Sequence, residues 1–320
     1  MILAVWAPLL LPLLAVPAAR LLAGWLPPRT AACMLAGTAV LLAGAATASL
    51  GLIATAGLLR LPPVAALGHL SLPWLDRISP DAGPLAAVAA VALGVIAALL
   101  LRSATRHRRE LGSARDLVRS ATGSPDGLAV LPDDRADAYA LPGRPGRIVV
   151  TAGMLRALGP EERCALLAHE RAHLGARHHL FLAAAEYAAA VHPALRLLRA
   201  PLSYHLERWA DENAATAVGS RTVTARAVAR AALAAAAPAR TAGLRPGLAP
   251  AAHTGPVPRR VAALLSPGPA QPSGRRTVVA LLLTACLCAS TGTVLDATHD
   301  LHQTVESAQS ARSSAPAHPR

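Results

Sequence analysis

Long apolar runs are the feature of this sequence that most restricts its fold. They occupy residues 2–25, 31–58, 84–101 and 277–295. A helix needs about 20 apolar residues to cross the hydrocarbon core of a bilayer, and each run is close to that length or longer. The chain is 53% hydrophobic, and its abundant Ala and Leu residues favour helices over strands. These runs predict a mostly α, polytopic membrane protein with about four spans.

The first run can be interpreted as a signal peptide or as a retained span. Small residues at positions 15–19 would suit a cleavage site. However, a signal peptide carries basic residues before its apolar core, and none precede this one. We therefore expect residues 2–25 to remain as the first membrane helix.

Arginines that flank the apolar runs predict the orientation of the chain. Six arginines follow the third run between residues 102 and 119, and Arg275 and Arg276 precede the fourth. Because Lys and Arg collect in cytoplasmic loops, the region between these runs is predicted to be cytoplasmic, in a multi-pass cell-membrane protein with both termini outside. The predicted parts are three N-terminal transmembrane helices (1–102), a cytoplasmic domain (103–275), a fourth transmembrane helix (276–297) and a short extracytoplasmic polar tail (298–320), expected to be disordered.

Charge and cysteine content narrow the expected partners. The net charge of +13 comes without basic patches interleaved with aromatics and without a nucleic-acid-binding motif. We therefore assign the arginines to membrane topology and solvated faces, and expect the lipid bilayer but no nucleic acid as a partner. The four Cys residues lack the paired spacing of a disulfide scaffold or a zinc ribbon, which suits a domain in a reducing compartment.

The predicted cytoplasmic region contains an H-E-x-x-H motif formed by His169, Glu170 and His173. Pro160, followed by two acidic residues, predicts the start of the helix that carries it. Two imidazoles four residues apart on a helix share one face and can bind a single zinc ion. Glu170 would then act as general base and take a proton from the attacking water. The alternative interpretation is a surface helix with scattered His and Glu residues.

A catalytic zinc site needs a third protein ligand, and two candidates follow the motif. His179 lies at the metzincin distance from His173, but Ala176 replaces the required Gly and no Met follows for a Met-turn. Glu207 is the better candidate, because Asp211 follows four residues later on the same helical face. Glu207 can bind the metal while Asp211 accepts the ring N–H of a ligating His. The alternative is an exposed, charged helix face.

This ligand set constrains the segment between the two helices. Residues 180–200 are apolar enough to span, but a single crossing would separate Glu207 from His169. Glu186, His192 and a break before a proline also argue against a span. We expect this segment to fold back as a buried or membrane-dipping helix.

Short extended segments precede the motif. Residues 127–131, 138–141 and 147–151 are predicted strands, with a Pro-Gly turn between the second and third. We expect one edge of their sheet to hold an extended peptide substrate by strand addition. Further helices are predicted near residues 153–157, 203–217, 222–237 and 258–265.

In this order, the stretches resemble the BlaR1/MecR1-type membrane metallopeptidases of peptidase family M56. They resemble more distantly the M48 group of HtpX and Ste24. The resemblance covers roughly residues 125–265 and the layout of the spans. It rests on residues 138–143 and 148–151, the HERAH helix, Arg177-His178, His192-Pro193, the LERWADENAA segment and residues 258–265.

The resemblance implies a zincin-like α+β metallopeptidase domain with one catalytic Zn²⁺. It implies that His169, His173 and Glu207 bind the zinc, that Glu170 is the general base, and that Asp211 supports a ligating imidazole. The implied substrate is a protein or peptide, often a cytosolic BlaI-like repressor in a signalling pathway. The predicted outer tail of about 25 residues is too short for a sensor domain, which puts β-lactam sensing in doubt.

We therefore predict a membrane-embedded zinc endopeptidase that cleaves protein substrates at the cytoplasmic face. One alternative is a non-catalytic receptor or scaffold, whose structural zinc would have four protein ligands. Others are an HtpX-like quality-control protease and a transporter or channel, which would need ionisable residues at the centres of its spans. Candidates for stabilising the oxyanion are Tyr204, His205, His253 and Arg260.

Overall fold

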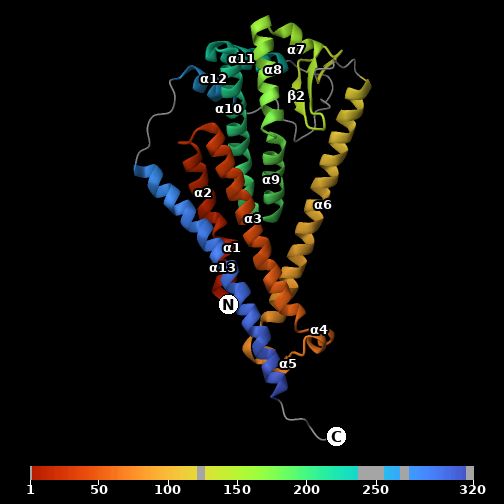
Figure 1. Cartoon of the computed structure of the whole chain (residues 1–320), viewed down its shortest axis with the longest axis vertical. Coiled ribbons are helices and arrows are strands. Elements are labelled where there is room, and N and C mark those ends of the chain that lie inside the picture. The colour runs from red at the N-terminus through yellow and green to blue at the C-terminus, as the bar shows by residue number, and fades with distance from the viewer. Residues whose placement is uncertain (1, 121–126, 237–255, 267–273, 315–320) are drawn as a thin grey trace.

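The computed structural model describes residues 2–120, 127–236, 256–266 and 274–314. The molecule is elongated, with a small sheet and a group of helices at one end and two short helices at the other (Figure 1). Long helices join the two ends. The prediction of a mostly α, membrane-type fold with a small sheet is confirmed.

Three of the described helices are long and apolar enough to cross a membrane, which indicates a multi-pass membrane protein. The second, third and fourth predicted spans lie within these helices. The three helices are α3 (Pro28–Leu58), α6 (Ala82–Ser120) and α13 (Gly274–Ser313). α6 and α13 extend well beyond the predicted spans, because polar residues continue each helix.

The first predicted span, residues 2–25, differs from the structure. It forms two shorter helices, α1 (Ile2–Leu10) and α2 (Pro12–Ala23). Pro12 separates them, because proline has no N–H to continue the hydrogen-bond ladder of a helix.

One apolar core joins the membrane helices to the helices that follow the motif. Alanines and leucines of α2 and α3 pack against apolar residues between 185 and 206 and against α13. This shared core holds residues 185–206 against the spans. Its most buried leucines are Leu35, Leu42, Leu195, Leu198 and Leu202.

The prediction of a disordered tail is wrong for residues 298–313, which continue α13 as a helix. This part of α13 packs on α4 (Pro62–Leu67) and α5 (Leu72–Ile78), where Ala308 joins a small apolar cluster. Gln309 Nε2 also donates a hydrogen bond of 2.9 Å to the carbonyl of Gly68. Contacts with distant residues therefore hold a segment whose own polarity suggested disorder.

A three-stranded sheet supports the helix that carries the motif. Its order is β1-β3-β2, with β1 parallel and β2 antiparallel to the central β3. Ile148 and Val150 of β3 share an apolar cluster with Met154 and Leu166, which lie on the next two helices. The predicted strands are confirmed as β1 (Leu128–Leu131), β2 (Ala138–Leu141) and β3 (Arg147–Thr151).

The helices after the sheet bring the two halves of the motif region together. The chain descends through α8 (Pro160–Gly175) and α9 (His178–Val191), reverses in the 3-10 segment η1 (Pro193–Leu198), and returns along α10 (Arg199–Val218) beside α8 (Figure 1). Residues 180–200 thus fold back; whether they dip into a membrane stays a prediction. The other helices of this region are α7 (Ala152–Ala157), α11 (Arg221–Ala235) and α12 (Val257–Leu265).

Glu162 fixes the start of α8. Its carboxylate accepts a hydrogen bond of 2.9 Å from the backbone N–H of Gly159. Arg226 and Arg230 of α11 pair with the same carboxylate at 2.8 and 2.9 Å. Glu162 is nearly fully buried, so this contact both caps α8 and ties it to α11.

Gly153 in α7 is predicted to be required for close packing. A Cβ added there would lie 2.0 Å from the carbonyl oxygen of Asp134, which is backbone and cannot rotate away. We expect Gly153→Ala to lower the free energy of unfolding by about 1–3 kcal/mol, measured as a lower Tm in detergent. Gly112→Ala in α6 is the matched control, because no atom lies within 4 Å of its added Cβ. Equal Tm values for the two variants would contradict the prediction.

Candidate metal centre

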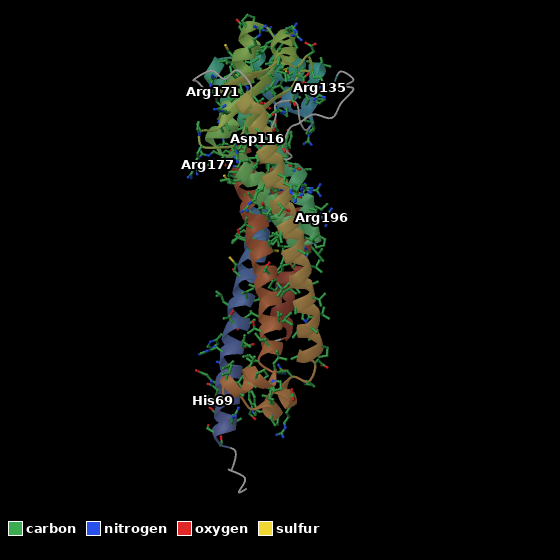
Figure 2. All side chains as sticks on the ribbon, turned by 90° about the vertical axis from the view of Figure 1, so that its right-hand side faces the viewer. His69, Asp116, Arg135, Arg171, Arg177 and Arg196 are labelled. Atoms are coloured by element: carbon green, nitrogen blue, oxygen red, sulfur yellow. The ribbon has the colours of Figure 1, made fainter. Side chains whose placement is uncertain are left out.

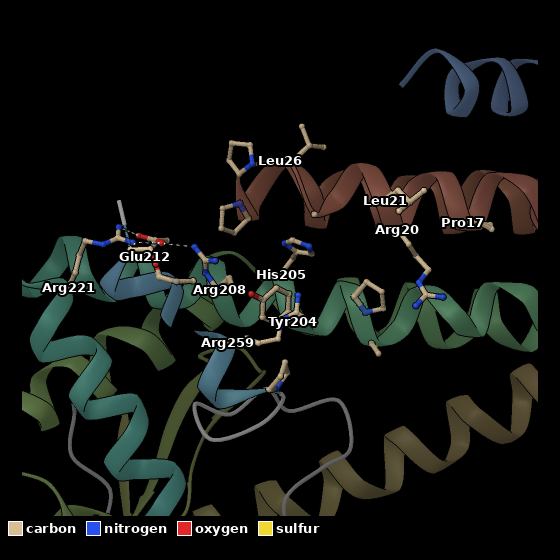
Figure 3. A pocket seen from close by; sticks show the side chains of 18 residues that line it. Pro17, Arg20, Leu21, Leu26, Tyr204, His205, Arg208, Glu212, Arg221 and Arg259 are labelled. Atoms are coloured by element: carbon tan, nitrogen blue, oxygen red, sulfur yellow. Dashed lines mark hydrogen bonds and ion pairs between the residues drawn. The ribbon is translucent and has the colours of Figure 1, made fainter. Parts of the chain in front are cut away.

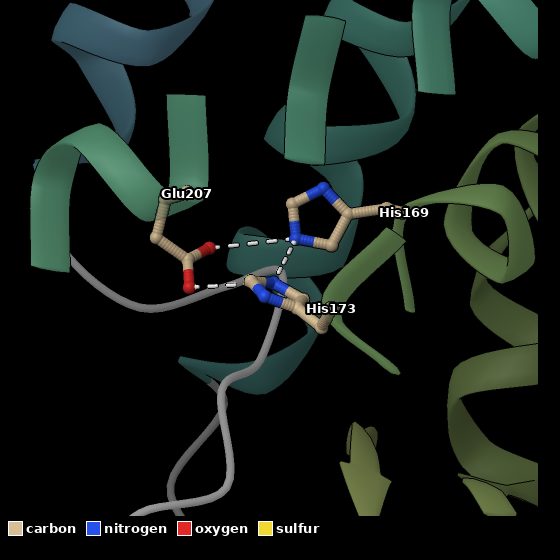
Figure 4. Close-up of side chains that lie close together, drawn as sticks. All are labelled: His169, His173 and Glu207. Carbon is tan, nitrogen blue, oxygen red and sulfur yellow. Dashed lines mark hydrogen bonds and ion pairs between the residues drawn. The ribbon is translucent and has the colours of Figure 1, made fainter. Parts of the chain in front are cut away.

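Three buried side chains from two helices converge on one point (Figure 4). α8 presents His169 and His173 one turn apart, and α10 presents Glu207. The Nε2 atoms of the two imidazoles lie 3.0 Å apart. The carboxylate oxygens of Glu207 lie 3.4 Å from Nε2 of His169 and 3.6 Å from Nε2 of His173. His179 is not part of this cluster.

The spacing of these atoms fits a small metal ion. Ligands about 2.0–2.1 Å from a tetrahedral zinc ion are about 3.3 Å from one another. The separations of 3.0, 3.4 and 3.6 Å lie around that value. Two imidazoles and one carboxylate are also the donor set of catalytic zinc sites, which leave one position open. The cluster is therefore a possible metal site whose residues suit zinc.

Asp211 lies behind His169, on the side away from the cluster. Its Oδ1 atom is 3.0 Å from Nδ1 of His169, and its side chain is fully buried. Burial disfavours a charged imidazole, but the hydrogen bonds and charges of Asp211 and Glu207 outweigh it and raise the pKa of His169 to about 9. The contact with Asp211 turns Nε2 of His169 toward the other members of the cluster.

Arg260 of α12 is buried beside both carboxylates. Its guanidinium lies 2.9 Å from Oε2 of Glu207 and donates to Asp211 at 2.6 and 2.8 Å. Burial would raise the pKa of Asp211, but Arg260 and His169 outweigh it and lower that pKa to about 2. Glu207, Asp211 and Glu170 in turn overcome the effect of burial on Arg260 and raise its pKa. One cation therefore compensates the acidic side of the site.

His178 lies behind the second imidazole. Its Nδ1 atom is 2.6 Å from Nδ1 of His173, and its ring packs 4.7 Å from the ring of Trp209. Burial, with the charges of His169 and His179, lowers the pKa of His178 to about 3. A neutral His178 can accept the Nδ1–H of His173, which leaves the Nε2 lone pair of His173 facing the cluster.

Sequence reasoning did not predict the contacts of His178 and Arg260. The turn at Arg177, with φ +53°, places His178 over the preceding helix, and no local pattern reveals that. Arg260, which the sequence offers only as a candidate for stabilising the oxyanion, pairs with two carboxylates. The available signal was that both residues belong to stretches that carry the family resemblance. Of the other candidates, Tyr204 and His205 line a neighbouring cavity, and His253 lies outside the described residues.

Comparison with known families supports a peptidase. The model for peptidase family M48 matches residues 101–193, which include the H-E-x-x-H helix but end before Glu207. No curated protein and no solved structure matches the chain. The family match and the apolar helices together support a membrane-associated metallopeptidase, a class that acts on proteins. The match supports the M48 group and leaves the resemblance to family M56 unconfirmed.

Arg260→Gln is predicted to destabilise the protein strongly. The variant would leave the carboxylates of Glu207 and Asp211 buried without their cation. Breaking a buried ion pair from one side costs about 3–5 kcal/mol, so we expect a clear fall in Tm. Arg171→Gln on the exposed side of α8 is the control and should leave Tm unchanged (Figure 2). A Tm of Arg260→Gln equal to that of the control would show that the guanidinium is dispensable.

Proposed function

We propose that this chain is a membrane-embedded zinc endopeptidase. His169, His173 and Glu207 bind the zinc, and Glu170 is the general base. The observation that carries the proposal is the convergence of these three donors from α8 and α10, with the H-E-x-x-H helix inside the stretch that matches family M48. Asp211 and His178 orient the two imidazoles through their Nδ1 atoms.

The residues around the cluster supply the remaining chemistry. When bound, zinc polarises the scissile carbonyl and lowers the pKa of water. Glu170 is fully buried and follows His169 directly on α8. It takes a proton from the attacking water and returns it to the leaving amine. Arg260 balances the carboxylates, so the site can hold several acids without losing its shape.

The proposed substrate is a protein, and it is either a substrate of quality control or a regulatory protein. The match to family M48 favours an HtpX-like quality-control role over cleavage of a BlaI-like repressor in a signalling pathway. Arginines after the third predicted span support a cytoplasmic catalytic domain with both termini outside. β1 and β2 are the sheet edges that can receive an extended peptide.

Glu170→Gln tests the general base. Glutamine cannot accept the proton, so cleavage of casein by the purified protein in detergent should fall by about 10²–10⁴-fold. Zinc content should stay unchanged, because Glu170 is not among the proposed ligands. Glu161→Gln, which alters an exposed acid on the same helix, should keep full activity. Undiminished cleavage by Glu170→Gln would reject the assignment.

Glu207→Ala tests the third ligand. Removing one of three ligands should reduce the bound zinc per protein well below one equivalent, measured by elemental analysis after dialysis. His179→Ala should retain the wild-type zinc content, because His179 lies outside the cluster. Full zinc retention by Glu207→Ala, or zinc loss by His179→Ala, would favour a different ligand set. Treatment with a chelator should abolish cleavage by the wild type, and added zinc should restore it.

A further inference from the structure

A cavity of about 1140 Å³ lies between α2, the turn into α3, α10 and α12 (Figure 3). It is separate from the metal cluster, since none of His169, His173 and Glu207 lines it. Its volume is slightly above the range of about 300–1,000 Å³ that is typical of small-molecule sites. The cavity therefore has room for a ligand beside the metal cluster.

The walls of the cavity carry an excess of positive charge. Arg20, Arg208, Arg221 and Arg259 line it, with Glu212 as the one carboxylate among its lining residues. Glu212 is already paired with Arg208 and Arg221. No carboxylate of the described residues pairs with the other two, Arg20 and Arg259; the guanidinium of Arg259 lies over the ring of Tyr204. The net positive charge of the lining favours an anionic ligand.

A buried imidazole supplies a further polar atom. His205 lines the cavity and is 8% exposed. The part of the ring that reaches the cavity adds a polar side chain to its lining.

The opposite wall is apolar and belongs to the membrane-side helices. Arg20 extends from the apolar helix α2 toward α10 (Figure 3). Leu13, Leu14 and Leu21 of the same helix are more than half exposed. A charged residue in such a helix is costly unless it faces a polar cavity or binds an anion. The cavity thus places cations beside an apolar surface, which is the pattern that an amphiphile requires.

We propose that this cavity binds the phosphate headgroup of an anionic phospholipid. Arg20 and Arg259 would pair with the phosphate, and the exposed leucines of α2 would contact the acyl chains. An acidic peptide is less well matched, because apart from Arg20 the α2 wall offers it leucine, proline and glycine residues. This proposal is independent of the proposed peptidase activity.

Native mass spectrometry of the full chain in detergent, with equal amounts of phosphatidylglycerol and phosphatidylcholine, tests the proposal. We expect phosphatidylglycerol to be retained at least about tenfold better, because the choline cation of phosphatidylcholine offsets the charge of its phosphate and would be repelled by the arginines of the cavity. The double variant Arg20→Gln with Arg259→Gln should lose that preference. Arg196→Gln, an exposed arginine that does not line the cavity, should keep it.

Two further measurements distinguish loss of lipid binding from a folding defect, and a lipid from other anionic ligands. The double variant Arg20→Lys with Arg259→Lys keeps the charge and should retain most of the preference. If soluble glycerol phosphate displaced the bound lipid as well as phosphatidylglycerol does, the cavity would be a site for free phosphate compounds, and the proposal of a lipid ligand would be wrong. Displacement by a glutamate-rich peptide, or an unchanged preference in the Gln double variant, would also overturn the proposal. Because no arm measures proteolysis, a failure here is distinguishable from a failure of the proposed function.

Discussion

The contact of Arg260 with Asp211 and Glu207 is the interaction on which the site depends. Glu170, Glu207 and Asp211 are all nearly fully buried, and carboxylates are costly to bury without compensation. Arg260 contacts two of them directly, and the charge of the third also raises its pKa. It comes from α12, a helix of nine residues that is distant in sequence from the motif. The arrangement of the buried acids on α8 and α10 therefore depends on α12, a short helix near the end of the chain.

The two imidazoles of the cluster are held by partners of different charge. His169 faces the carboxylate of Asp211, whereas His173 faces the neutral ring of His178. A carboxylate partner makes an imidazole a stronger electron donor than a neutral partner does. The structure accordingly raises the pKa of His169 and lowers that of His173, where burial is the main cause. The two histidines are thus equivalent in sequence spacing but not in chemistry.

Local patterns predicted the strands and the start of the motif helix, because these depend on residues close together in the chain. The pairing of Glu207 with the two histidines was also predictable, since helical spacing places the relevant side chains on single faces. The helical end of α13 was not predictable, because Ala308 is buried only through its contact with α4 and α5. The contact of His178 depends on the left-handed turn at Arg177, and that of Arg260 depends on tertiary packing. Both require knowledge of the three-dimensional fold.

α13 also has a mechanical consequence. It contains 40 residues without a break, which corresponds to a rod of about 60 Å at 1.5 Å per residue. One end packs with α2, and the other carries Ala308 against α4 and α5. Long helices bend gently unless a proline, a glycine pair or a bulge interrupts them, so a tilt at one end moves the other. α13 therefore connects the two ends of the molecule as a single helix, and only residues 266–273 separate it in sequence from α12.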